Sequence, residues 1–233
     1  MTKRIVRDYF TAFRWSKIKE TYAKEQWWLF LYSLILLPLI CQFYDTKESM
    51  LAYWMVYIPL FFAMFAAPLH PPVLPKMLYL CPMSRKMRKD YIVKSCYIRV
   101  ASPIILGIAC VAILLWQGVG DWICGAGILL NLILFAAMMG SGVNAKGYGK
   151  KLENGQRVMN MDTAQGIYEA ISLILAYLVS MLYAFLLATD ANAMQWVKWV
   201  LIGATLLIQL PVTLKYLSYW QESVENSIYY EGR

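Results

Sequence analysis

Six apolar runs, each close to the length of a membrane-spanning helix, constrain this 233-residue chain more than any other feature. A bilayer core of about 30 Å requires roughly 20 apolar residues of helix. The runs are Trp27–Tyr44, Met50–Leu69, Tyr97–Trp116, Trp122–Met139, Ile167–Leu187 and Trp196–Trp220. Because 60% of the residues are hydrophobic and 15% are charged, a single water-soluble core cannot hold them. We therefore expect an all-α integral membrane protein with six transmembrane helices, in which residues 1–233 form one domain.

Lysine and arginine lie almost entirely on one side of these runs. Seven precede the first run, six lie in residues 70–96, four in 140–166 and one after residue 220, whereas the short segments between carry only Lys47. Basic loops remain in the cytoplasm, so both termini, including the tail 221–233, and the two long loops are expected there. This topology explains most of the net charge of +8 without a nucleic-acid partner. We expect a multi-pass protein of the cell membrane.

The first 26 residues form an amphipathic segment ahead of the first run. Apolar side chains recur on one side of a helix, namely Ile5, Tyr9, Phe10 and Phe13. The apolar stripe changes face after Arg14, which predicts a bend near residues 14–16. We expect an N-terminal interfacial helix on the inner surface of the lipid bilayer. An ordinary amphipathic helix packed against the bundle is the alternative.

Prolines interrupt the chain after the second run. Pro68, Pro71 and Pro72 are expected to end that helix. A short helix then lies between two further prolines, and it consists of Pro75, Lys76, Met77, Leu78, Tyr79, Leu80 and Cys81. Ser84 suits the N-cap of a helix that continues through four basic residues into the third run. We expect the short helix to contact another protein in the cytoplasm; a turn resting on the membrane is the alternative.

Polar and flexible groups within the runs are few. Hydrogen bonds between helices are expected from Asn131, Ser172, Ser180, Thr205 and Gln209. Gly140 and Gly142 favour close approach of the fourth run to a neighbour, and prolines within four of the runs favour kinks. The four charged residues in the runs lie near run ends, where long side chains can reach the membrane surface: Arg99, Glu169, Lys198 and Lys215. For Glu169 we expect an interfacial carboxylate, with a contact to a cation or gate as the alternative.

Motifs for catalysis or for metal binding are missing from the chain. The glycine-rich loop 140–166 does not complete a phosphate-binding loop, because Asn144 stands at the first glycine position and Lys151 follows Gly149-Lys150. The one histidine, His70, has no companions at ligand spacing, and no Ser/His/Asp set is present. The sequence predicts no metal site, no cofactor and no enzyme activity of its own.

The layout resembles a known family. Six spans with both ends inside, an amphipathic helix before the first span and a proline-framed helix between the second and third are similar to an exporter-type ABC transporter permease subunit. The run Leu80-Cys81-Pro82-Met83-Ser84-Arg85 is similar to the Leu-Pro-x-Ser-Arg signature of that family, with Cys81 in place of an apolar residue. The resemblance implies two permease copies, identical or different, and separate cytoplasmic ATPase subunits that hold ATP and Mg. Residues 75–81 would be the coupling helix.

The resemblance also implies a cargo. Small bacterial exporters of this kind move amphipathic or antimicrobial peptides, including phenol-soluble modulins, across the plasma membrane. The path would lie between two permeases and include Tyr57, Phe61, Asn131 and Glu169. Core packing or lipid contact is the alternative for the aromatic residues of the second run, which also include Tyr53, Phe62 and Phe65. A non-transporting membrane immunity or scaffold protein that binds a cytoplasmic partner is the alternative function.

Overall fold

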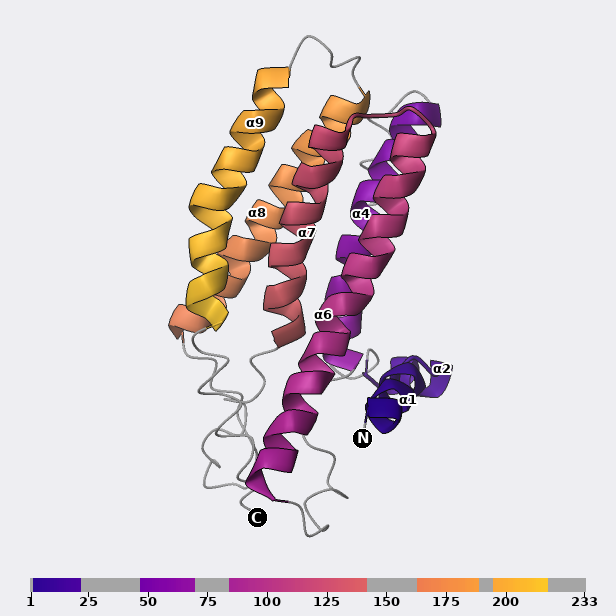
Figure 1. Ribbon diagram of the computed structural model, residues 1–233, viewed down its shortest axis with the longest axis vertical. Coiled ribbons are helices and arrows are strands. Elements are labelled where there is room, and N and C mark those ends of the chain that lie inside the picture. The colour runs from indigo at the N-terminus through magenta and orange to yellow at the C-terminus, as the bar shows by residue number, and fades with distance from the viewer. Residues whose placement is uncertain (1, 22–46, 70–83, 142–162, 189–194, 218–233) are drawn as a thin grey trace.

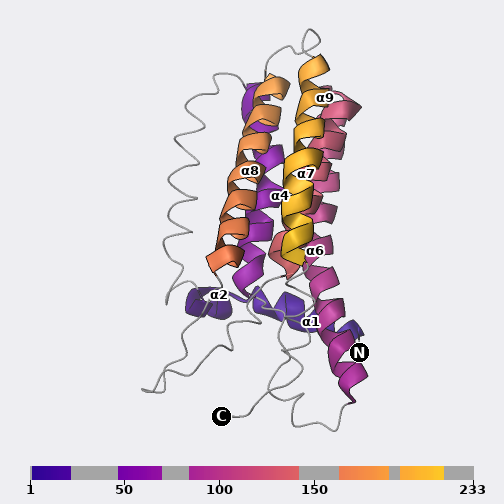
Figure 2. The ribbon, with the colours of Figure 1, turned by 90° about the vertical axis from the view of Figure 1, so that its left-hand side faces the viewer.

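The computed structural model of the chain describes residues 2–21, 47–69, 84–141, 163–188 and 195–217, and nearly all of these are helical. Long helices that alternate in direction form a bundle, and two short helices lie crosswise at one end of it (Figures 1 and 2). The helices are α1 (Thr2–Ala12), α2 (Trp15–Thr21), α4 (Lys47–Leu69), α6 (Arg85–Trp116), α7 (Trp122–Ser141), α8 (Thr163–Ala188), α9 (Gln195–Ala204) and the π-helical turn η4 (Thr205–Gln209). After η4 the last helix continues to Leu217.

Four of these helices are long and apolar enough to cross a membrane: Arg85–Trp116, Trp122–Ser141, Ala170–Leu187 and Gln195–Leu217. Within α4 the apolar stretch is shorter, Met50–Ala66. The first expected run, Trp27–Tyr44, lies outside the described residues. The described chain is therefore all-helical and has the composition of a multi-pass membrane protein.

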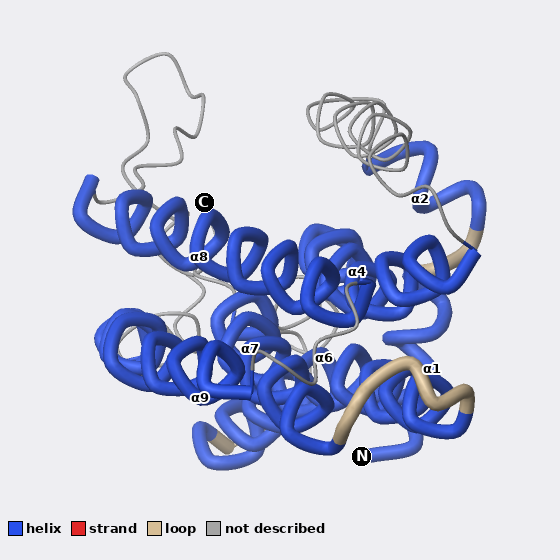
Figure 3. The backbone as a smooth tube through the Cα atoms, turned by 90° about the horizontal axis from the view of Figure 1, so that it is seen from above, coloured by secondary structure: helices blue, strands red, loops and turns tan. Residues whose placement is uncertain are grey.

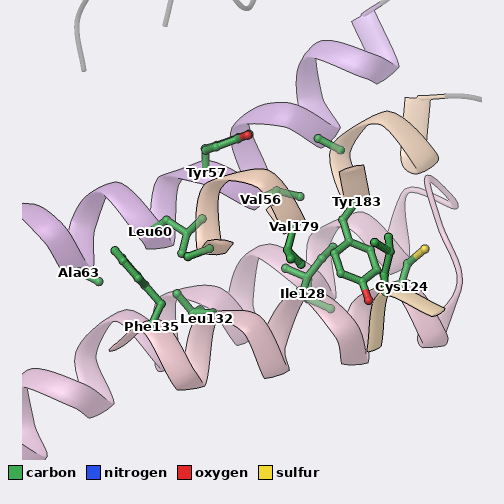
Figure 4. Close-up of a cluster of buried hydrophobic side chains, with 14 of the residues drawn as sticks. Val56, Tyr57, Leu60, Ala63, Cys124, Ile128, Leu132, Phe135, Val179 and Tyr183 are labelled. Carbon is green, nitrogen blue, oxygen red and sulfur yellow. The ribbon is translucent and has the colours of Figure 1, made fainter. Parts of the chain in front are cut away.

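The core of the bundle is built around α7. In its most apolar stretch 72% of the residues are buried, against 39% in α8 and 28% in the last helix. Seen along the bundle, α8 and α4 form one row, and α9, α7 and α6 lie in a second (Figure 3). Figure 4 shows the apolar contact between the rows, in which Leu60 of α4, Ile128 of α7 and Val179 of α8 are buried. The outward faces of α6, α8 and the last helix remain apolar, as lipid contact requires.

Local sequence features set the helix ends as expected. Ser84 caps α6, because its hydroxyl accepts a hydrogen bond from the Met87 N–H at 3.4 Å. The predicted bend in the N-terminal segment is confirmed, since α1 ends at Ala12 and α2 begins at Trp15. The turn between α6 and α7 is tight and uses Gly118 with a φ of 71°, which favours glycine.

Inside the helices, a proline changes the helical winding and a glycine allows two helices to approach closely. Pro211 has no N–H to donate, and just before it the helix widens into η4, where the Leu210 N–H donates to the Thr205 carbonyl five residues back. The predicted close approach at Gly140 is confirmed: a Cβ there would lie 2.4 Å from Val100 Cγ2 of α6. Gly142 lies outside the described residues.

Candidate functional site

The predicted site residues fall into three sets. The docking element, Pro75–Cys81, and His70 lie outside the described residues. Glu169 belongs to α8, but its side chain is not among those described. Tyr9 and Asn131, among the others, belong to two groups of polar residues. The N-terminal junction comprises Asp8, Tyr9, Tyr91, Arg99 and Ser102, and the midspan polar cluster comprises Asn131, Ser180, Thr205 and Gln209.

Hydroxyl groups hold α1 against α6 at the N-terminal junction. The Tyr9 and Ser102 hydroxyl oxygens are 2.6 Å apart, and Ser102 Oγ donates to the Arg99 carbonyl at 3.3 Å. That carbonyl has no helical donor, because the residue four positions on is Pro103. Since Ser102 uses its proton there, Tyr9 is the donor to Ser102. Burial raises the pKa of Tyr9, so it remains a neutral donor at physiological pH.

The apolar side of α1 divides into two faces. Ile5 and Tyr9 are buried, with exposed fractions of 0% and 2%, whereas Phe10 is 67% exposed. Beyond the end of α1, the Phe13 ring stacks on Phe62 of α4 with centroids 5.7 Å apart. A second polar contact is made by Tyr91, whose hydroxyl donates to Asp8 Oδ2 at 3.2 Å. The helix therefore packs on the bundle, as one interpretation of the sequence held, and also presents an outward apolar face.

Arg99 does not reach the membrane surface as the sequence suggested. It is only 3% exposed, and its Nη2 donates to the Met139 carbonyl of α7 at 3.4 Å. Lys198, at the start of the last helix, is also buried, at 4%. The expectation was wrong for both residues: Arg99 has its acceptor inside the bundle, and Lys198 is buried against Asp121 in the turn between α6 and α7. Lys215, in contrast, is exposed.

The midspan polar cluster joins three helices. Asn131 Nδ2 donates to the Ala176 carbonyl at 3.0 Å and to Ser180 Oγ at 2.8 Å, both on α8. Gln209 Nε2, on η4, donates to the Asn131 carbonyl at 3.4 Å. The predicted hydrogen bonding between helices is thus confirmed for these residues. Thr205 instead donates to the Leu201 carbonyl of its own helix at 2.8 Å.

Two amide oxygens of the midspan polar cluster accept no hydrogen bond from the described residues. Asn131 Oδ1 and Gln209 Oε1 are buried and have no hydrogen-bond partner among the described residues. Their orientation follows from the nitrogens, which face carbonyl oxygens and must therefore donate. Such groups are costly in an apolar interior, and π-helical turns such as η4 often mark functional positions. The cluster can accept hydrogen bonds from a donor that reaches it.

Aromatic residues of α4 meet α8 beside this cluster. The Tyr57 hydroxyl donates to the Tyr177 carbonyl at 3.3 Å, and the Phe61 and Tyr177 rings lie 5.9 Å apart. The structure thus brings three predicted path residues, Tyr57, Phe61 and Asn131, to one segment of α8. Tyr53 and Tyr57 are buried in the core (Figure 4 labels Tyr57), which agrees with the core-packing alternative for them.

Sequence reasoning missed an ion pair at the opposite end of the bundle. Asp121 Oδ2 accepts from Lys198 Nζ at 2.8 Å, and Asp121 Oδ1 accepts from the Cys124 N–H at 2.9 Å. Burial raises the pKa of Asp121, but the bonds from Lys198 and Cys124 outweigh it and hold the pKa below its ordinary value. An Asp immediately before a helix, three residues before the N–H it caps, was the available signal for the cap, and the sequence carried no signal for the pairing with Lys198. We name this contact the Asp121–Lys198 clamp.

Metal and thiol chemistry find little support in the described part of the chain. It contains no group of three or more His, Cys, Asp or Glu residues that could hold a metal ion. The cysteines at 96, 110 and 124 are buried thiols rather than halves of a disulfide.

Comparison with known proteins adds no relative. No protein-family model, no curated protein and no solved structure matches this chain.

Proposed function

We propose that this chain is the permease subunit of an ATP-driven exporter of the ABC type, with six spans and both termini in the cytoplasm of a bacterium. Two copies, or this chain and a second permease, form the translocation path. Separate cytoplasmic ATPase subunits bind ATP and Mg and supply the work. The cargo is an amphipathic or antimicrobial peptide.

One observation carries this proposal more than any other. The described part of α4 ends and α6 begins at the end of the bundle where α1 and α2 lie crosswise (Figure 1). The segment 70–83, whose sequence has apolar residues framed by prolines, connects Leu69 to Ser84. A partner that pushes on this segment acts directly on the capped start of α6 and, through the N-terminal junction, on α1.

The midspan polar cluster supports a moving bundle rather than a static anchor. Unused acceptors on Asn131 and Gln209 allow the helices to exchange hydrogen-bond partners without leaving more groups unsatisfied. The π-helical turn that ends with Gln209 supplies a place where the last helix can change its winding. A non-transporting immunity or scaffold protein, the other candidate, would need neither feature.

The test is co-purification of the tagged full-length chain, followed by identification of the bound chains. We expect an ATPase with a complete phosphate-binding loop. Leu78→Asp should abolish its recovery and leave membrane insertion intact. Trp116→Asp, which adds the same carboxylate at an 83% exposed position on the opposite end of the bundle, is the matched control and should retain the ATPase.

Two results would contradict the proposal. The first is recovery of the chain without any ATPase, combined with unchanged peptide efflux in cells that lack the gene; this result favours the scaffold alternative. The second is equal ATPase recovery with Leu78→Asp and with Trp116→Asp, which would exclude residues 75–81 as the docking element.

A further inference from the structure

We propose that α1 and the first turns of α6 form a binding surface for the phosphate groups of anionic phospholipids. We name this surface the cationic patch. It consists of exposed residues on both helices: Lys3, Arg4, Arg7, Arg85, Lys86 and Lys89. The inference goes beyond the proposed function and does not depend on it, since any membrane protein with this surface would select such lipids.

The fold brings together two basic segments that lie about 80 residues apart in the sequence. Ile5 and Tyr9 are buried where α1 meets α6, and the Asp8–Tyr91 hydrogen bond fixes α1 beside the turns of α6 that follow Lys89. Because these contacts use the inner side of α1, its cations remain on the outer side. The two segments therefore act as one charged surface rather than as two separate tails.

Apolar groups accompany the cations on α1. Lys3, Arg7 and Phe10 are spaced four and three residues apart, so they share one side of the helix. Phe10 is 67% exposed and Val6 is 37% exposed, and Trp15 at the start of α2 is 75% exposed. A soluble phosphate would contact only the charges. Cations with exposed aromatic and aliphatic groups on a crosswise helix match a lipid headgroup and the upper part of its acyl chains.

Acidic residues are fewer than basic residues in the two helix segments that form this surface. Asp8 accepts the hydrogen bond of Tyr91 and lies 3.9 Å from Arg4 Nε, which is a weak pair. Asp90, on α6, is the other carboxylate of the two helix segments. Within α1 and the first turns of α6, the six cations of the patch therefore outnumber two carboxylates. Each cation near an anionic membrane surface strengthens association about fivefold at low salt, with screening as salt rises.

The experiment measures lipid binding to the full-length chain in a neutral detergent. Native mass spectrometry follows a titration with phosphatidylglycerol and, separately, with phosphatidylcholine of the same acyl chains. We expect phosphatidylglycerol to bind at least tenfold more tightly. The triple variant Lys3→Gln/Arg4→Gln/Arg7→Gln should weaken its binding roughly a hundredfold, and Lys86→Gln/Lys89→Gln roughly twentyfold. Binding of phosphatidylcholine should not change.

Two control variants sharpen the result. Arg4→Lys/Arg7→Lys retains both charges and should retain phosphatidylglycerol binding. Lys215→Gln removes an exposed cation from the last helix, which lies away from α1 in Figure 1, and should have little effect. Glycerol phosphate at millimolar concentration should not compete, because it lacks the acyl chains that contact Phe10. Effective competition would instead identify a site for soluble phosphate.

The inference fails if both lipids bind the chain equally, or if Lys215→Gln weakens phosphatidylglycerol binding as much as the triple variant does. It also fails if the triple variant binds phosphatidylglycerol normally but loses a cytoplasmic protein partner, because the patch would then be a protein-docking surface. Since Leu78→Asp should leave lipid binding unchanged, failure of this inference and failure of the exporter proposal are separate outcomes.

Discussion

The two ends of the bundle are fastened in different ways. At one end, the Asp121–Lys198 clamp joins the turn after α6 to the start of the last helix through a 2.8 Å ion pair, and Lys198 is almost fully buried. At the other end, no buried ion pair joins the described parts of α1 and α6, and α1 rests on α6 through two hydroxyl contacts: the 2.6 Å pair of Tyr9 and Ser102, and the 3.2 Å bond from Tyr91 to the Asp8 carboxylate. The cations of α1, Lys3, Arg4 and Arg7, are exposed there.

The two kinds of contact determine which end of the bundle can move at low free-energy cost. Separating the clamp leaves a buried charge without its partner, which is expensive in an apolar interior. Separating the N-terminal junction exchanges its polar contacts for contacts with water or lipid headgroups and uncovers Ile5 and the Tyr9 ring, which can then contact lipid, so it costs less than separating the clamp. We therefore expect the basic end to change shape while the clamped end stays closed, and the following substitutions test that order.

The largest effect is expected from Asp121→Asn. Asparagine can still accept the Cys124 N–H, but it leaves the Lys198 ammonium buried without a counter-ion. We expect a loss of about 3 kcal/mol in the free energy of unfolding, at the low end for a buried pair because the Asp121 side chain is 31% exposed. Denaturant unfolding in detergent measures it. In Asp121→Asn/Lys198→Met the loss should be smaller than in the single variant, and a larger loss would contradict the clamp.

Acidic pH should lower the free energy of unfolding for the same reason as Asp121→Asn, though by less. The folded pKa of Asp121 lies below its ordinary value of 3.8, so the pair stabilises the fold fully above about pH 5. As the pH falls below 4 and through the folded pKa, the carboxylate is protonated and that contribution is lost. The same pH change should affect Asp121→Asn less than the original chain.

The next substitution tests whether the whole basic end of the bundle is loosely packed or only its contact with α1. Gly140→Ala places a methyl 2.4 Å from Val100 Cγ2 and 3.1 Å from the Val100 backbone nitrogen, so α6 and α7 must separate. We expect a loss of about 2 kcal/mol in the free energy of unfolding. Gly203→Ala is the matched control, because its new methyl meets nothing within 4 Å, and it should be neutral or stabilising. Equal stability of the two variants would mean that the spans, too, are loosely packed near the basic end.

The sequence predicted the features that depend on neighbours along the chain. Apolar length located the four helices that can cross a membrane, and Ser84 as a cap and the bend after Ala12 followed from local hydrogen-bond and periodicity rules. The hydrogen-bonding role of Asn131 followed from the cost of an amide at membrane depth.

Contacts between distant segments could not be predicted in this way. In the sequence, Arg99 and Lys198 resemble residues that extend to the membrane surface, because a sequence does not show that Met139 of α7 and Asp121 of the turn before α7 contact them. The division of α1 into a packed face and an outward face had the same cause, since Ile5 and Phe10 have similar apolar character and differ only in where α6 lies.

A smaller effect is expected in the middle of the bundle, between the two ends. Asn131→Ala removes the bonds to Ala176 and Ser180, and it also removes a buried oxygen without a partner among the described residues. Because these contributions oppose each other, we expect a net loss of about 1 kcal/mol. Ser180→Ala removes one bond and leaves the Asn131 amide in place, so it should cost less. A larger loss for Ser180→Ala would contradict the bond assignment.

The smallest effect should come from the N-terminal junction. Tyr9→Phe keeps the buried ring and removes the hydroxyl that donates to Ser102, which we expect to cost about 0.5–1 kcal/mol. Since this contact attaches α1 rather than closing the bundle, the change should show as faster amide hydrogen exchange in α1, with the exchange of α7 unchanged. Tyr97→Phe, at a 69% exposed position on α6, is the control and should alter neither. If Tyr9→Phe instead speeds exchange throughout α6 and α7, the junction holds the bundle itself, and the contrast between a movable basic end and a fixed clamped end is wrong.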